Sequence, residues 1–248
     1  MSRHDFLDID FDTWPMADVE GWLDAREADS DFAYVVTPNV DHMVRLANAE
    51  EEVLLAYERA DLCVCDSRVL KRVAQFCGVS LSVVPGSDLV FAMFDHLLRD
   101  GDRVCLVGGS AEHAATLRQK HPGLVILHHT PPMGLRRDPA ARTEVIDFAE
   151  RAAARYTLLA VGSPQQELIA HEMAMSGRVR GTALCIGASV DFLVGAQSRA
   201  PRMLQRVGLE WSWRLMMQPR RMARRYLIDG PRILPMALRW RRLARSAL

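Results

Sequence analysis

The sequence has no long uncharged apolar run, and only five of its 248 residues are cysteines. Because a helix that spans a bilayer needs roughly 18 or more consecutive apolar residues, no membrane span is expected. Residues 1–5 lead into an acidic segment rather than into a signal peptide. Four cysteines lie inside apolar runs, where a buried thiol acts as a small hydrophobe: Cys63, Cys65, Cys105 and Cys185. The body of the protein is therefore expected to stay in the cytoplasm, with structural cysteines.

Signatures of metal sites and dinucleotide sites are also missing. The eight histidines form no cluster with metal-ligand spacing. Asp29-Ser30-Asp31 has the D-x-D form with which many nucleotide-sugar enzymes hold a divalent metal, but it precedes the first clear strand and is interpreted as a solvated loop. Gly108-Gly109-Ser110 is not a G-x-G-x-x-G motif, which argues against a nucleotide-dependent oxidoreductase. We therefore expect no metal and no cofactor.

Acidic residues are scarce at one end of the chain. Residues 199–248 contain thirteen arginines, no lysine and two acids, so their charge is 13 − 2 = +11. Residues 1–198 carry the other 18 basic and 29 acidic residues, which gives 18 − 29 = −11 and a formally neutral chain. This asymmetry indicates that the basic tail meets an anionic surface or ligand. We place the domain boundary there, between a body, 1–198, and an appendage, 199–248.

The appendage is rich in Trp, Leu and Met as well as in arginine, and prolines interrupt it, which predicts short amphipathic helices. One helix is expected from Pro201 to about residue 218. In a second helix, apolar and basic residues occupy opposite faces: Met236, Trp240, Leu243 and Ala247 against Arg241, Arg242 and Arg245. This pattern is typical of a helix at a membrane interface. It also occurs where an amphipathic helix docks on the core of its own protein.

Six short apolar or β-branched runs alternate with helical stretches in the body. The runs are residues 34–37, 62–65, 103–107, 124–127, 158–161 and 183–186, and the helical stretches are 40–60, 69–76, 88–98, 111–120, 140–155 and 165–175. Such runs are typical of parallel strands buried on both faces. The alternation predicts a Rossmann-like α/β fold, an open and mostly parallel sheet flanked by helices, with the basic amphipathic helical appendage at its C-terminal end.

Polar residues follow several of these runs, and ligands bind beyond the carboxyl ends of the strands in such sheets. Thr37 and Asn39 follow the first run. Asp66 directly follows the second run, where a partly desolvated carboxylate could act as a general base. The alternative for Asp66 is a cap of the next helix, since aspartate is a preferred N-cap.

Two further turns at this edge carry glycine or amide groups. Backbone N–H groups at Gly108 and Gly109 could face a phosphate, or the glycines could serve only a tight turn. Pro164, Gln166 and Glu167 open a helix after the fifth run. Such amides and carboxylates can hydrogen-bond sugar hydroxyls, or they can act within the first turn of the helix.

Taken together, these segments resemble the WecG/TagA/CpsF family of bacterial glycosyltransferases over nearly the whole chain. The matching segments are Thr37-Pro38-Asn39-Val40-Asp41-His42, the strand end at Asp66, Pro85-Gly86-Ser87-Asp88-Leu89, the Gly108-Gly109 turn with His121-Pro122-Gly123-Leu124, Gly162-Ser163-Pro164-Gln165-Gln166-Glu167, and the appendage motifs Arg199-Ala200-Pro201, Gln205-Arg206-Val207-Gly208-Leu209-Glu210-Trp211, Arg214-Leu215, Pro219-Arg220-Arg221 and Arg224-Arg225-Tyr226.

The resemblance implies an inverting, metal-independent transfer of a hexose-type sugar from a UDP-sugar to a polyprenyl-diphosphate-linked acceptor. The donor sugar could be N-acetylmannosamine, its uronic acid, glucose or another hexose. Asp66 is implied as the base, Thr37 and Gln166 line the sugar site, and tail arginines stabilise the departing diphosphate. The candidate catalytic residues are thus Asp66, Thr37, Arg214, Arg221 and Arg224, and the candidate substrate-binding residues are Asn39, Gly108, Gly109, Pro164, Gln166, Glu167 and Arg206.

The same resemblance implies a peripheral protein on the inner face of the cytoplasmic membrane, bound to anionic lipid, with self-association left open. The competing hypothesis is a non-enzymatic nucleic-acid-binding protein whose tail contacts phosphates. The Trp and Leu residues of the tail suit a membrane better, and an acidic body would repel a polyanion. No nucleic-acid partner is therefore expected.

Three positions depart from the family pattern. Ser67 stands in place of the usual glycine, Val83 in place of an arginine and Gln165 in place of a lysine. Two cations expected near the ligand are therefore missing. Arg68 and Lys71 are candidates to replace them, although both positions also fit an exposed helix face.

Overall fold

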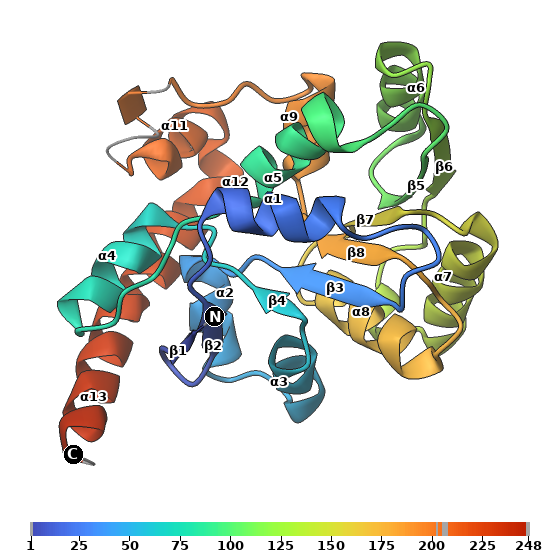
Figure 1. The fold of residues 1–248 in the computed structure, drawn as a ribbon. Helices are drawn as coiled ribbons and strands as arrows, with labels where there is room; N and C mark the ends of the chain where they lie inside the picture. Colours follow the sequence, from blue (N-terminus) through green and yellow to red (C-terminus); the bar gives the residue numbers. More distant parts are fainter. Residues whose placement is uncertain (1, 202, 205–207, 247–248) are drawn as a thin grey trace.

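The computed structural model describes residues 2–201, 203–204 and 208–246, with side chains for all of these except residues 221, 245 and 246. Its centre is a parallel six-stranded sheet with the order β4-β3-β8-β7-β5-β6 (Figure 1). The strands are β3 (Ala33–Val36), β4 (Leu62–Cys63), β5 (Arg103–Gly108), β6 (Val125–His129), β7 (Tyr156–Ala160) and β8 (Thr182–Cys185). The predicted Rossmann-like α/β fold is confirmed, and each of the six apolar runs overlaps one strand.

Successive residues of a strand point to opposite faces of the sheet, so each strand supplies two cores. Tyr34 and Val36 pack into one core and Val35 into the other. The first core is covered by α2 (Val40–Leu46), α3 (Glu51–Glu58), α4 (Arg68–Phe76), α7 (Pro139–Ala152) and α8 (Gln165–Ser176). The second is covered by α1 (Met16–Asp24), α5 (Gly86–Ala92) with its π-helical continuation η1 (Met93–Leu97), α6 (Ala111–Lys120) and α9 (Ser189–Val194).

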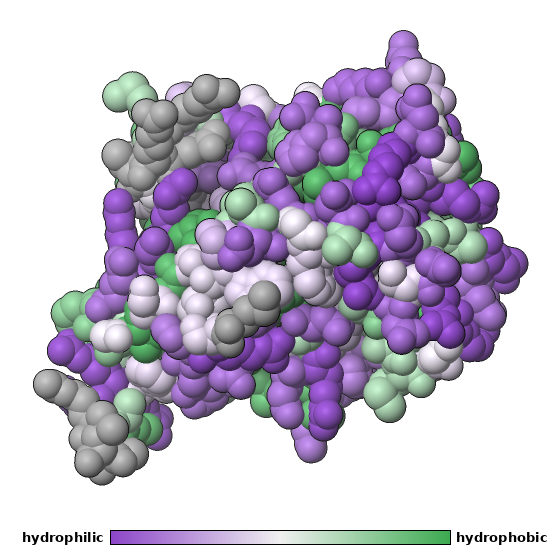
Figure 2. Space-filling model, viewed as in Figure 1, coloured by the Kyte–Doolittle hydropathy of each residue, from purple (hydrophilic) through white to green (hydrophobic). Residues whose placement is uncertain are grey.

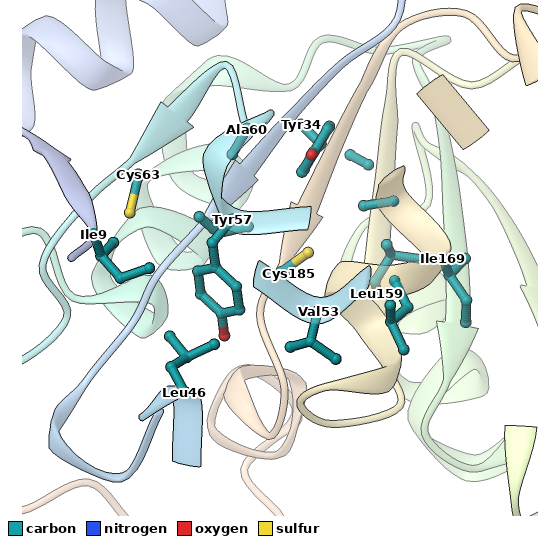
Figure 3. Close-up of a cluster of buried hydrophobic side chains, with 14 of the residues drawn as sticks. Ile9, Tyr34, Leu46, Val53, Tyr57, Ala60, Cys63, Leu159, Ile169 and Cys185 are labelled. Atoms are coloured by element: carbon teal, nitrogen blue, oxygen red, sulfur yellow. The ribbon is translucent and has the colours of Figure 1, made fainter. Parts of the chain in front are cut away.

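Residues 40–60 form the two helices α2 and α3 rather than the single helix that the sequence predicted. A straight helix of this length would be roughly 30 Å long, whereas β3 has only four residues. The turn between α2 and α3 folds the chain back, so that Leu46, Val53 and Tyr57 lie together in one core (Figure 3). Tertiary packing thus overrides a continuous helical pattern.

An N-terminal hairpin docks beside β4. It consists of β1 (Arg3–Asp5) and β2 (Asp10–Asp12), which pair in antiparallel fashion. Phe6 and Phe11 are fully buried. The Asp12 carboxylate accepts a hydrogen bond from the Cys63 backbone N–H at 2.9 Å, which ties the hairpin to the edge strand.

The described part of the tail is helical and packs against α2 and α4 (Figure 1). Its elements are α11 (Glu210–Met217), α12 (Pro219–Ala223), the π-helix η3 (Arg224–Asp229), the 3₁₀ turn η4 (Gly230–Arg232) and α13 (Ile233–Ser246). Of the helix predicted from Pro201, α11 is present, and residues 202 and 205–207 lie outside the described residues. None of the described helices is both long enough and apolar enough to cross a membrane.

Helix α13 docks on the body through the apolar stripe that the sequence pattern identified. Ile233 and Ala237 are buried, and Met236 and Trp240 pack against the same core. The Trp240 ring meets Phe6 edge-on, with 5.4 Å between the ring centroids. Intramolecular docking, the alternative for this helix, therefore applies to its first two turns, residues 233–240. Leu243 is 63% exposed, and Ala247 lies outside the described residues.

Candidate active site at the carboxyl edge of the sheet

A cavity of about 420 Å³ lies beyond the carboxyl ends of β3 and β4, between the body and the tail. The body contributes the segments that follow these two strands and the first turns of α4 and α5. The tail contributes α11, η3 and the start of α13. Among the described residues, three acids and three arginines line the cavity: Asp41, Asp66, Glu210, Arg68, Arg214 and Arg225.

Asp66 lies on the cavity wall, immediately after the edge strand. Its backbone N–H donates to the carbonyl of Pro38 at 3.0 Å, which fixes the turn that follows β4. Oδ1 accepts a hydrogen bond from the Gly86 backbone N–H at 2.7 Å, and Oδ2 accepts from the Asn39 amide at 3.4 Å. Desolvation raises the pKa of Asp66 to about 6, and the Arg214 guanidinium and these hydrogen bonds only partly oppose that rise.

The capping interpretation of Asp66 is wrong. The N-cap of α4 is Ser67, whose hydroxyl accepts a hydrogen bond from the Leu70 N–H at 3.2 Å. Ser67, one of the three departures from the family pattern, therefore caps the helix itself. The Asp66 carboxylate is left to face the cavity, and a carboxyl with a raised pKa in a cavity is typical of an acid–base group.

Asn39 and Thr37 support Asp66 in different ways. Asn39 caps α2 by accepting hydrogen bonds from the backbone N–H groups of the next turn, and its amide nitrogen is thereby directed at Asp66. Thr37 is buried and donates to the carbonyl of Cys185 at 3.2 Å. It is not among the described residues that line the cavity. A Cβ on Gly86 would come within 3.1 Å of the Thr37 hydroxyl, so Thr37 packs directly behind the N–H donor to Asp66.

Of the tail arginines whose side chains the structure describes, two line the cavity, and only one of them was predicted. Arg214 donates to Glu210 at 3.0 Å, and its guanidinium lies 4.9 Å from the centre of the Phe192 ring. Arg225 donates to the Asn39 side-chain oxygen at 3.4 Å and lies 3.3 Å from a carboxylate oxygen of Asp41.

Arg224, which the sequence placed at the diphosphate, points elsewhere. Its side chain is 83% exposed and lies 3.6 Å from Asp229, and the neighbouring Arg225 lines the cavity instead. The segment is a π-helix, and its register differs from that of the α-helix that a sequence pattern assumes. The side chain of Arg221 and the whole of Arg206 lie outside the described residues.

The predicted glycine turn lies away from this cavity. Gly108 ends β5, which three strands separate from β4, and Gly109 follows it. Both have positive φ, and a Cβ on Gly108 would lie 2.8 Å from the backbone of Ala160. The tight-turn interpretation therefore accounts for Gly108, and neither glycine is among the described residues that line the cavity.

The Pro164 segment forms a packed polar cluster rather than an open wall. The Gln166 side chain accepts from the Gly187 N–H and donates to Glu167, both at 2.9 Å, and both side chains are buried. Burial raises the pKa of Glu167. Pro164 itself lines a second cavity of about 260 Å³, on the other side of α2. Gln166 thus shapes the end of β8 through a backbone contact.

The cavity wall reflects one of the two missing cations of the family pattern. Val83 lines the cavity and makes that part of its wall apolar. Arg68, one of the candidates to compensate, also lines it, from the first turn of α4. Within the described residues, no group of three His, Cys, Asp or Glu side chains could hold a metal ion.

These features define a Rossmann-like α/β protein whose ligand cavity lies at the carboxyl edge of the sheet and contains a carboxyl group with a raised pKa. A comparison with protein families makes the class specific. The model of the glycosyl transferase WecG/TagA/CpsF family matches residues 4–247, and the chain belongs to this family. It is therefore a glycosyltransferase of cell-surface glycan synthesis, and membership implies a sugar donor and a lipid-linked acceptor. The match covers the body and the tail alike.

Proposed function

We propose that the protein is an inverting, metal-independent glycosyltransferase. It moves a hexose-type sugar from a UDP-sugar to a polyprenyl-diphosphate-linked acceptor, with Asp66 as general base. The observation that carries this proposal is the Asp66 carboxyl, held by the Gly86 N–H on the wall of the cavity, with its pKa raised to about 6. A base is most effective when its pKa lies near the working pH, because it is then deprotonated but still basic.

In the proposed reaction, Asp66 takes the proton of the acceptor hydroxyl as that oxygen attacks the anomeric carbon. The attack comes from the face opposite the nucleotide, so the configuration inverts. The bond between the anomeric carbon and the β-phosphate oxygen breaks, and UDP leaves with the electron pair. Arg214 and Arg225 are the described tail cations at the cavity that can stabilise this negative charge.

Thr37 and Gln166 act in this proposal as positioning residues. Both bind backbone groups near the end of β8, at Cys185 and Gly187. They therefore set the shape of the sheet edge where the sugar would lie. Asn39 has a more direct part, since its side chain contacts both Asp66 and Arg225.

The proposal includes attachment of the tail, 199–248, to an anionic membrane on the cytoplasmic side. Nine of the fourteen large apolar side chains that are exposed in the described chain belong to this tail. In the space-filling view, most of the visible surface is hydrophilic, and apolar residues appear there in scattered patches (Figure 2). Exposed leucines beside arginines are typical of a segment that inserts into the headgroup region of anionic lipid.

Substitution of the base tests the reaction. A panel of UDP-sugars with lipid-linked acceptors in detergent, read by mass spectrometry, first identifies the donor. Asp66→Asn should then lower kcat by about 10²- to 10⁴-fold, the usual contribution of a general base, and leave UDP-sugar binding largely intact. The control is Asp147→Asn, which removes a surface carboxylate paired with Arg178 at 2.8 Å. Near-normal turnover of Asp66→Asn would eliminate Asp66 as the base.

Substitution of the exposed leucines tests the membrane contact. Leu234, Leu238 and Leu243 are 44–63% exposed on α13. Replacing all three by serine should weaken sedimentation with anionic vesicles by roughly 30- to 1,000-fold, since partial burial of three leucines is worth about 2–4 kcal/mol. Met133 and Met175, exposed on the body, provide the matched serine controls. Equal vesicle binding by both sets would show that α13 does not meet the lipid.

A further inference from the structure

A second carboxylate, Glu210, lies on the wall of the same cavity as Asp66. It is the first residue of α11, and its Oε1 accepts a hydrogen bond from Nη2 of Arg214 one turn later, at 3.0 Å. The two side chains are about equally exposed, 31% for Glu210 and 32% for Arg214. The pair is therefore partly desolvated, which makes it stronger than an ion pair on an open surface.

Arg214 has two carboxylates within its electrostatic reach and is paired with only one of them. Arg214 and Asp66 line the same cavity, and the positive charge of Arg214 is the strongest influence that lowers the pKa of Asp66. The hydrogen bonds to the Asp66 carboxylate nevertheless come from neutral donors, the Gly86 N–H and the Asn39 amide. No described lysine or arginine forms an ion pair with it.

The choice of partner decides whether Asp66 can work as a base. A direct ion pair with arginine lowers the pKa of a carboxylate by about 1–3 units, and a carboxylate with so low a pKa accepts a proton poorly. In the structure the guanidinium is bound by Glu210 instead, and the negative charge of Glu210 further raises the pKa of Asp66. The other titratable groups around Asp66 and the cavity are Cys65, Asp41, Arg68, Arg225 and Tyr226.

We propose that Glu210 is a positioning residue that holds Arg214 away from Asp66 and releases it to the anionic leaving group of the donor. The contact between Arg214 and the Phe192 ring supports the release of Arg214 to the leaving group, because it keeps the guanidinium in place while its ionic partner changes. This inference rests on the proposed function, since it takes Asp66 as the base and a diphosphate as the leaving group.

A titration of Asp66 tests the inference without any substrate. In the full-length protein with carboxyl-¹³C-labelled aspartate, the NMR titration of Asp66 should move to lower pH in Glu210→Gln. It should stay in place in Glu172→Gln, a matched control in which the glutamate is 27% exposed and pairs with Arg142 at 2.7 Å. Glu210→Asp keeps the charge on a shorter side chain, so the titration of Asp66 in this variant should lie between those in Glu210→Gln and in the unsubstituted protein.

A double variant separates positioning from simple repulsion between the two acids. If Glu210 acts by holding Arg214, the shift that Glu210→Gln causes should shrink at least by half when Arg214 is already replaced by methionine. An unchanged titration in Glu210→Gln, or an equal shift in the Arg214→Met background, would overturn the proposal.

The transfer assay provides the functional readout. Glu210→Gln should move the acid limb of kcat/KM to lower pH and reduce the plateau kcat by roughly three- to tenfold, because a weaker base transfers the proton less readily. If Glu210→Gln leaves the NMR titration of Asp66 unchanged, only the role proposed for Glu210 is refuted. Transfer that persists in Asp66→Asn would instead refute the proposed function, so the two failures are distinguishable.

Discussion

Replacement of Asp66 by asparagine should stabilise the folded protein near neutral pH while it lowers kcat by about 10²- to 10⁴-fold. The rise in the Asp66 pKa from 3.8 to about 6 means that the ionised carboxylate is disfavoured in the fold. At about 1.4 kcal/mol per pKa unit, this amounts to about 3 kcal/mol in the fully ionised state. A neutral asparagine avoids this cost and can still accept the hydrogen bond from Gly86 through its side-chain oxygen.

The sign of the pH dependence follows from proton binding. Between about pH 4 and pH 6 the folded protein binds more protons at Asp66 than the unfolded chain does, so its stability falls as pH rises through this window. Asparagine does not titrate, and it loses the weak hydrogen bond from Asn39, at a cost of about 1 kcal/mol. The variant should therefore be more stable by about 2 kcal/mol at about pH 8 and nearly equal in stability at about pH 4.5.

Urea denaturation of both proteins at these two pH values measures the effect. Because every other group titrates alike in the two proteins, the difference between them isolates Asp66. A variant that is less stable by the same amount at both pH values would refute the reasoning, since it would mean that ionised Asp66 carries no desolvation cost.

Three further substitutions test how the site is built. In Gly86→Ala, the new methyl group should press against Thr37, displace the backbone N–H that binds Asp66 and reduce kcat at least tenfold. Addition of Thr37→Ala should restore part of the activity. If it restores none, the two residues are not in contact. Arg214→Met should move the acid limb of the pH profile to higher pH, because removal of a nearby cation raises the pKa of the base. An acid limb that stays in place would show that Arg214 does not influence the pKa of Asp66. Arg225→Met should reduce kcat/KM at least tenfold more than Arg224→Met, and the opposite order would show that the arginine predicted from sequence is the functional one.

The sheet could be predicted because its signal is local. A parallel strand buried on both faces needs a continuous apolar run, and all six runs became strands. The N-terminal hairpin and α1 have no comparable apolar run, because contacts with residues distant in sequence stabilise their positions. Arg155 is an example: it is 1% exposed, bonds to the backbone carbonyls of Asp24 and Arg26, and pairs with Asp102 at 2.9 Å. No pattern within residues 16–24 encodes that contact.

The sequence by itself determined the fold class, the position of Asp66 at a strand end and the contrast between an acidic body and a basic tail. These follow from hydrophobic periodicity and from charge, which are properties of short segments. Only the tertiary structure decided which groups surround the base. Gly86, Glu210 and Arg225 come from segments that are 20, 144 and 159 residues away along the chain (86 − 66, 210 − 66, 225 − 66). The positions of Glu210 and Arg225 depend on how the tail docks on α2 and α4 and on the π-helical register of η3, and neither is encoded in a local pattern.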